Sequence, residues 1–135
     1  MFFRALLIIV LGYAAPEALV KSAISDRLLD ALEKVESGGN RRAVGDRKLR
    51  DKAYGCLQIR QPVCDDVNRH YGTRCRAEAM LGNKALSRQV CRQYLLLHGG
   101  PRASAERYAR IWNGGPQGWR KKATLVYWKR VRRVL

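Results

Sequence analysis

The chain has 135 residues and a mass of 15.4 kDa, which is enough for one compact domain and too little for an enzyme with a separate cofactor-binding domain. It carries 27 Lys and Arg against 11 Asp and Glu, a formal net charge of +16 at pH 7. The hydrophobic fraction of 47% argues against disorder driven by charge. The basic excess predicts an anionic partner, which is a nucleic acid, a membrane surface or an acidic polymer.

The N-terminus has the composition of a secretory signal peptide over residues 1–14. Arg4 precedes a short apolar run, and small residues precede a cleavage point after Ala14. The apolar run is too short to span a membrane; an N-terminal anchor or a buried strand is the alternative. We therefore expect an exported, periplasmic or secreted protein, with a leader over residues 15–24 and one domain over residues 25–135.

Four cysteines are the only ones in the chain: Cys56, Cys64, Cys75 and Cys91. An even number in a small exported domain predicts two disulfides. Three pairings are open, although a Cys64–Cys75 bridge would close a short local loop and leave Cys56–Cys91. Because no CxxC pair exists and the two histidines do not have zinc-finger spacing, we expect no metal and no other cofactor.

Helical periodicity comes first in the domain. Ser25 or Asp26 can cap a helix that runs to about residue 36, where the Gly38-Gly39 pair ends it. Periodicity is lost over residues 41–59, and two short extended segments around a charged turn predict a small hairpin. Further helices are expected from about Pro62, from Lys84, from Pro101 and from a Thr124 cap. The predicted fold class is mainly α, with one small β element after the first helix.

Glu36 is the residue that chemistry singles out. It falls on the apolar face of the first helix, four residues after Leu32 and seven after Leu29. It also lies at the helix C-terminus, where the macrodipole disfavours negative charge. Both effects favour a protonated carboxyl, which is the state that a general acid needs. A helix-end Glu that simply reaches water is the alternative.

Four ordered segments surround this position, and they are specific as a set. They read ESGGN followed by AVG (36–45), GCLQI (55–59), WNGGP (112–116) and TLVY (124–127). In this order they resemble the SLT-type lytic transglycosylases, whose domain is lysozyme-like and α+β. The chain departs from that pattern at Gly45, Cys56 and Trp112, where the family commonly has Ser, a small or apolar residue, and Tyr.

The resemblance implies cleavage of the β-1,4 bond between N-acetylmuramic acid and N-acetylglucosamine in peptidoglycan. Glu36 would protonate the leaving oxygen and then act as base in forming a 1,6-anhydro product. A hydrolytic lysozyme needs a second carboxylate. The c-type lysozymes have an Asp directly before a YGxxQI segment, and this chain has Ala53 there. Transglycosylation is therefore expected, unless Asp46 or Asp51 in the hairpin supplies that carboxylate.

Other side chains are candidates for substrate binding. Gln58 offers an amide to an N-acetyl group, and Asn113 lies beside two glycines that allow close approach. Tyr127 could orient Glu36 from the last helix. Ser37, which directly follows Glu36, is also a candidate for substrate binding. Tyr54, like Trp112, is an aromatic that could stack on a sugar. The alternatives for these residues are helix capping and core packing.

Residues 120–133 are strongly basic with aromatic residues between, a pattern that by itself suggests nucleic-acid binding. No nucleic-acid-binding motif is recognisable, and export argues against a genomic target. The expected partners are therefore peptidoglycan glycan strands and the anionic cell envelope, with the protein a monomer and no nucleic acid bound. A non-enzymatic cationic binder on the same scaffold is the further alternative.

Overall fold

The computed structural model describes residues 24–135. The predicted signal peptide, and the leader up to residue 23, lie outside the described residues. The domain is built from five α-helices, two short strands and two short 3-10 helices. In chain order these are α2 (Asp26–Ser37), β1 (Val44–Gly45), β2 (Ala53–Tyr54), α3 (Gln61–Tyr71), η1 (Ala77–Met80), α4 (Lys84–Gly99), α5 (Ala105–Gly114), η2 (Gly118–Arg120) and α6 (Thr124–Val134). The predicted class, mainly helical with one small β element, is confirmed.

Local chemistry sets the ends of α2 where the sequence predicts them. The Ser25 hydroxyl accepts a hydrogen bond from the Leu28 amide at 3.2 Å, which is an N-cap. Gly38 ends the helix in the left-handed conformation, with φ 65°, and its amide donates to carbonyls of the last turn. Glu36 is thereby held in the final turn of α2.

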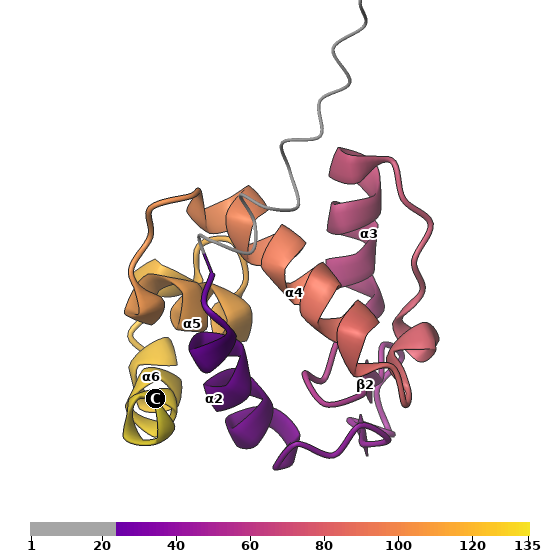
Figure 1. Cartoon of the computed structure of the whole chain (residues 1–135), viewed down its shortest axis with the longest axis horizontal. Coiled ribbons are helices and arrows are strands. Elements are labelled where there is room, and N and C mark those ends of the chain that lie inside the picture. The colour runs from indigo at the N-terminus through magenta and orange to yellow at the C-terminus, as the bar shows by residue number, and fades with distance from the viewer. Residues whose placement is uncertain (1–23) are drawn as a thin grey trace, which may run out of the picture.

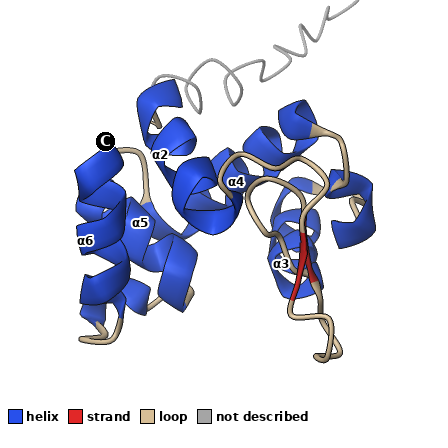
Figure 2. Ribbon diagram, turned by 90° about the horizontal axis from the view of Figure 1, so that it is seen from below, coloured by secondary structure: helices blue, strands red, loops and turns tan. Residues whose placement is uncertain are grey.

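The hairpin after α2 is short and antiparallel, with Val44 opposite Tyr54 and Gly45 opposite Ala53. Tyr54 also pairs with Ile59 through a backbone bridge. The second strand therefore leads directly through a tight turn into α3. In Figure 2 the two strands (red) lie beside α3, at the far end of the molecule from α5 and α6.

Two helix starts differ from the sequence prediction. Helix α5 begins at Ala105 rather than Pro101, because the Ser104 hydroxyl accepts from the Arg107 amide at 3.1 Å and caps it there. Thr124 is not a cap. It is buried, and its hydroxyl accepts from Arg110 at 2.9 Å and lies 2.8 Å from two carbonyl oxygens of the preceding turn. Neither 3-10 helix was predicted.

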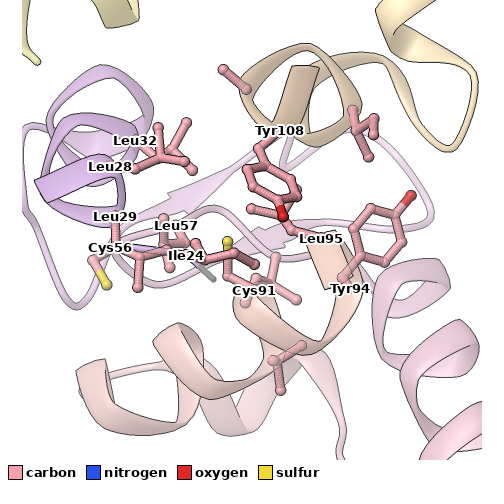
Figure 3. Packing of buried hydrophobic residues seen from close by; sticks show 14 of the residues in the cluster. Ile24, Leu28, Leu29, Leu32, Cys56, Leu57, Cys91, Tyr94, Leu95 and Tyr108 are labelled. Atoms are coloured by element: carbon pink, nitrogen blue, oxygen red, sulfur yellow. The ribbon is translucent and has the colours of Figure 1, made fainter. Parts of the chain in front are cut away.

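Helix α4 runs through the middle of the domain, between α3 on one side and α2, α5 and α6 on the other (Figure 1). The core gathers around it, as Figure 3 shows for Cys91, Tyr94 and Leu95 of α4. Leu29 and Leu32 of α2 are fully buried in the same cluster. No helix in residues 24–135 combines the length and the apolar character that crossing a membrane would require.

A charged cluster joins α2 to α4. Glu33, whose side chain is 7% exposed, accepts from Arg88 at 2.7 Å and lies 3.5 Å from the Lys84 ammonium. Arg88 also pairs with Asp30, and Arg92 with Asp26. The Glu33, Arg88 and Arg92 side chains are largely buried, whereas those of Asp30 and Asp26 are largely exposed. Each buried charge therefore has a partner where α2 packs on α4.

The four cysteines are free thiols in the structure, so the two predicted disulfides are not present in it. Cys64 of α3 and Cys75 are nonetheless neighbours. Burial and the adjacent Cys75 thiol raise the pKa of the Cys64 thiol. Asn68 holds the Cys75 backbone against α3, donating to its carbonyl and accepting from its amide, both at 2.9 Å.

Candidate active site

Glu36 faces α6. The Tyr127 hydroxyl donates a hydrogen bond to Glu36 Oε1 at 2.7 Å, across 91 residues of sequence. Burial raises the pKa of the Glu36 carboxyl above its ordinary value of 4.5, while the Tyr127 hydrogen bond and the positive charges of Arg130 and Arg60 offset part of that rise. Within residues 24–135 Glu36 makes no ion pair. A half-buried acid with these properties is suited to proton donation.

A cleft of about 280 Å³ lies next to this carboxyl, between two walls of the molecule. The hairpin and the start of α3 form one wall, and the end of α5 together with α4 forms the other. Its lining residues are Glu36, Asp46, Ala53, Gln58, Arg60, Val63, Tyr94, Trp112, Asn113 and Gly115.

Two lining residues have backbone conformations that most residues avoid. Asp46, with φ 52°, and Gln58, with φ 55°, are the two non-glycine residues with positive φ in the described part of the chain. Such strain persists where the surroundings fix it, and it is enriched at functional sites. Asp46 turns the chain directly after β1, and Gln58 turns it between β2 and α3, so both turns contribute side chains to the cleft.

Gly45 explains how the Gln58 amide fits beside the hairpin. A Cβ at position 45 would lie 2.2 Å from Gln58 Oε1, so any other residue there would displace the amide. The Gln58 nitrogen donates to the carbonyls of Gly55 at 3.0 Å and Ala43 at 3.3 Å. The glycine that departs from the transglycosylase pattern is therefore matched to this glutamine.

Arg60 fixes the hairpin side of the cleft. Its guanidinium donates to the Asp51 carbonyl at 2.7 Å and forms an ion pair with the Asp46 carboxylate. The Asp46 side chain is 43% exposed, so water screens this pair. Arg60 thus places one carboxylate oxygen of Asp46 while it lines the same cleft as Glu36.

The opposite wall is aromatic. Tyr94 of α4 and Trp112 of α5 pack edge to face, with ring centroids 5.8 Å apart. Asn113 follows Trp112 in the last turn of α5 and is exposed. The wall therefore offers apolar ring surface next to one amide, a combination that suits the face and the polar groups of a sugar.

The structure brings together Glu36, Asp46, Gln58, Asn113 and Tyr127 of the predicted site, the last through its bond to Glu36. Two predicted residues lie elsewhere. The Ser37 hydroxyl donates to the Cys56 carbonyl at 2.7 Å, which ties the end of α2 to the loop after β2. Tyr54 lines a separate cavity of about 200 Å³ on the other side of the hairpin.

Sequence reasoning missed Arg60, Tyr94 and Val63 as cleft residues. Asp51, the other candidate second carboxylate, also lines the cavity beside Tyr54 rather than the cleft. The helical spacing of Tyr94 with Val90 and Leu97 predicts only a core residue. Arg60 carried a usable signal, because it directly follows the GCLQI segment. No group of three His, Cys, Asp or Glu in the described part of the chain could hold a metal ion.

A helical domain with a hairpin, and with a glutamate and an aspartate lining one cleft, is typical of glycosidases of the lysozyme fold. The solved lysozyme of Tapes japonica covers 82% of this chain and 90% of its own, with a TM-score of 0.69 and 24% identity. The lysozyme of Meretrix lusoria, solved with the inhibitor PliI of Aeromonas hydrophila, has a TM-score of 0.68 over the same shares, also at 24% identity.

Sequence comparison identifies the family. The chain is 34% identical to a lysozyme of Ostrea edulis over 116 residues, which are 84% of this chain and 82% of the relative. It is 34% identical to a lysozyme of Magallana gigas over 114 residues, 82% and 80% of the two chains. No protein-family model matches the sequence. The chain belongs to the family of these invertebrate lysozymes, and it is a lysozyme-like enzyme.

The predicted resemblance was therefore right about the lysozyme-like fold and the class of enzyme. Its finer part, membership of the SLT-type transglycosylases, is not what the relatives support, because both are lysozymes.

Proposed function

We propose that this chain is a muramidase that hydrolyses the β-1,4 bond between N-acetylmuramic acid and N-acetylglucosamine in peptidoglycan. The observation that carries the proposal is Glu36, a half-buried carboxyl on the cleft wall that is bonded to Tyr127 and has a raised pKa. A carboxyl that stays protonated toward neutral pH can deliver its proton to the glycosidic oxygen as that bond breaks.

Asp46 is the second carboxylate in this proposal. Protonation of the leaving oxygen produces an oxocarbenium-like transition state, which needs a negative charge or an activated water on its other side. Asp46 lines the same cleft, and its ion pair with Arg60 orients its carboxylate. Gln58 and Asn113 would hold the N-acetyl and hydroxyl groups, and Trp112 and Tyr94 would pack on the sugar.

The test is digestion of purified peptidoglycan, followed by mass spectrometry of the soluble products. Hydrolysis adds one water to each cleaved bond and leaves reducing ends that borohydride can reduce. We expect such products from the wild type and none above background from Glu36→Gln. Full activity of Glu36→Gln would contradict the assignment of the acid, and no release by the wild type would contradict the proposed function.

Lytic transglycosylation is the second candidate, and one observation favours it. Ala53 lines the cleft at the position where c-type lysozymes have their Asp, and the Asp46 carboxylate is already engaged in an ion pair with Arg60. In that case the muramic 6-hydroxyl attacks instead of water, and Glu36 returns as the base. The same digestion separates the two reactions, because 1,6-anhydro products have no reducing end.

The proposed setting is outside the cytoplasm. Residues 1–14 have a signal-peptide composition, and peptidoglycan is an extracytoplasmic substrate. We further propose that the protein works as a monomer. Amino-terminal sequencing of the protein recovered from its native host tests cleavage near Ala14, and an intact N-terminus on an intracellular protein would contradict export.

A further inference from the structure

The last quarter of the chain has an unusual charge balance. Residues 101–135 contain ten basic residues and one acidic residue, Glu106, which pairs with Arg110 at 3.1 Å. Residues 24–100 contain fifteen basic and nine acidic residues, and six of these fifteen cations lie in ion pairs, as in the Glu33 cluster and the Arg60–Asp46 pair. The α5–α6 side of the molecule therefore presents cations that the chain does not neutralise.

Two of these cations are organised by an aromatic ring. The Arg107 guanidinium lies over the Trp119 ring at 4.1 Å from its centroid, and the Arg120 guanidinium lies over it at 4.6 Å. Neither guanidinium makes an ion pair or a side-chain hydrogen bond with any residue of the described chain. Stacking on a ring restrains a guanidinium while leaving its N–H donors directed outward.

The backbone around this group is tightly fixed. A Cβ at position 118 would lie 2.1 Å from the Arg110 carbonyl, so only glycine allows η2 to pack this closely on α5. Arg110 also donates to Thr124 at 2.9 Å and to the Lys121 carbonyl at 3.2 Å, which ties the loop after η2 to α5. Arg107 and Trp119, from two different elements, are thus held in register.

We propose that Arg107 and Arg120, held on Trp119, form a binding site for the phosphodiester groups of an anionic cell-wall polymer. Two restrained guanidiniums without a partner match the planar, bidentate geometry by which arginine binds phosphate. A wall polymer fits better than a bilayer because both guanidiniums cover the Trp119 ring, which leaves little ring surface to insert into lipid. The choice of a wall polymer rests on the proposed function.

The experiment measures binding of a purified glycerol-phosphate polymer by calorimetry, with the Glu36→Gln chain so that cleavage plays no part. In that background, Arg107→Gln/Arg120→Gln should weaken binding about tenfold. The matched control, Arg132→Gln/Arg133→Gln, removes the same charge from the exposed end of α6 and should weaken it less than threefold. Equal effects of the two pairs would mean general charge attraction and would overturn the site.

Trp119→Leu keeps every charge and should still weaken binding two- to fivefold, because the ring no longer restrains the guanidiniums. Thermal unfolding confirms that each variant is folded.

Polyglutamate and phosphatidylglycerol vesicles are the comparison probes. Binding of either one as tight as that of the polymer, with the same dependence on Arg107 and Arg120, would overturn the assignment to a wall phosphodiester. Polymer binding with no muramidase activity in the wild type would contradict the proposed function alone.

Discussion

Helix α2 carries two inward glutamates, one turn apart, and the two have different partners. On the side of α4, Glu33 is held by the Arg88 guanidinium and the Lys84 ammonium. On the side of α6, Glu36 meets a neutral tyrosine hydroxyl and the open cleft, and burial raises its pKa. The partner of a buried acid, and not burial alone, therefore decides whether that acid stabilises the fold or is available for proton transfer.

The largest expected effect lies on the Glu36 side. Glu36→Gln keeps the shape of the side chain but removes the transferable proton, so peptidoglycan cleavage should fall by about 10²- to 10⁴-fold. The rate of release of soluble muropeptides measures this. Glu33→Gln is the matched control, and its folded fraction should retain most of the activity. Comparable losses of activity in the two folded variants would contradict a catalytic role that belongs to Glu36 alone.

The next effect lies on the Glu33 side and concerns stability. Glu33→Gln leaves Arg88, whose side chain is 14% exposed, without its most buried partner, although Asp30 and Asp26 remain nearby. Removing one member of a buried pair costs about 3–5 kcal/mol, and the remaining acids should bring this loss toward the lower end. Urea unfolding measures it. A loss below 1 kcal/mol would show that the cluster does not hold α2 on α4.

The Cys64–Cys75 pair lies outside α2, so a disulfide there should affect neither Glu33 nor Glu36. We propose that Cys64 and Cys75, which are neighbours, form a disulfide in an oxidising compartment. Closing this loop should stabilise the domain by about 3 kcal/mol without changing the pH dependence of activity. Alkylation without reduction, followed by peptide mass mapping, detects the bridge. Oxidised protein in which both residues are alkylated would refute the pairing.

The pH dependence of stability should also separate Glu36→Gln from the wild type. Because folding raises the Glu36 pKa, the protonated form is favoured in the folded state. The contribution of Glu36 to the stability of the fold is therefore complete below its ordinary pKa of 4.5, and it is lost as pH rises through the folded-state pKa. Relative to the wild type, Glu36→Gln should therefore gain stability between pH 4 and pH 7 in thermal unfolding. If the stability difference between Glu36→Gln and the wild type were the same at pH 4 and at pH 7, the Glu36 pKa would not be raised.

The smallest expected effect comes from Tyr127→Phe. The Tyr127 hydrogen bond lowers the Glu36 pKa against the effect of burial, so its loss should raise that pKa further. The alkaline limb of the pH–rate profile should move to higher pH. Tyr94→Phe, which changes a cleft tyrosine that does not bond to Glu36, should leave the limb in place. Identical profiles for both variants would exclude Tyr127 as a positioning residue.

The sequence could predict features set by local chemistry. The Ser25 cap, the Gly38 stop and the periodicity of α2 place Glu36 in the last turn, and the structure agrees.

The sequence could not predict contacts between elements. Thr124 is buried and accepts a hydrogen bond from Arg110, and that hydrogen bond joins two helices. The sequence offers Tyr54 as a ring that could stack on a sugar and Ser37 as the neighbour of Glu36, yet neither lines the cleft. Arg60 directly follows a recognisable motif, but its contacts with Asp46 and with the Asp51 carbonyl depend on the fold of the hairpin, which the sequence does not specify.

Side-chain carboxyl NMR can show directly whether Glu36 is held protonated for catalysis. A ¹³C titration of the wild type, assigned by comparison with Glu36→Gln, gives the pKa of this one group. We expect a midpoint above 4.5 that coincides with the alkaline limb of the pH–rate profile. A midpoint at or below 4.5, or an activity that does not follow this titration, would contradict it.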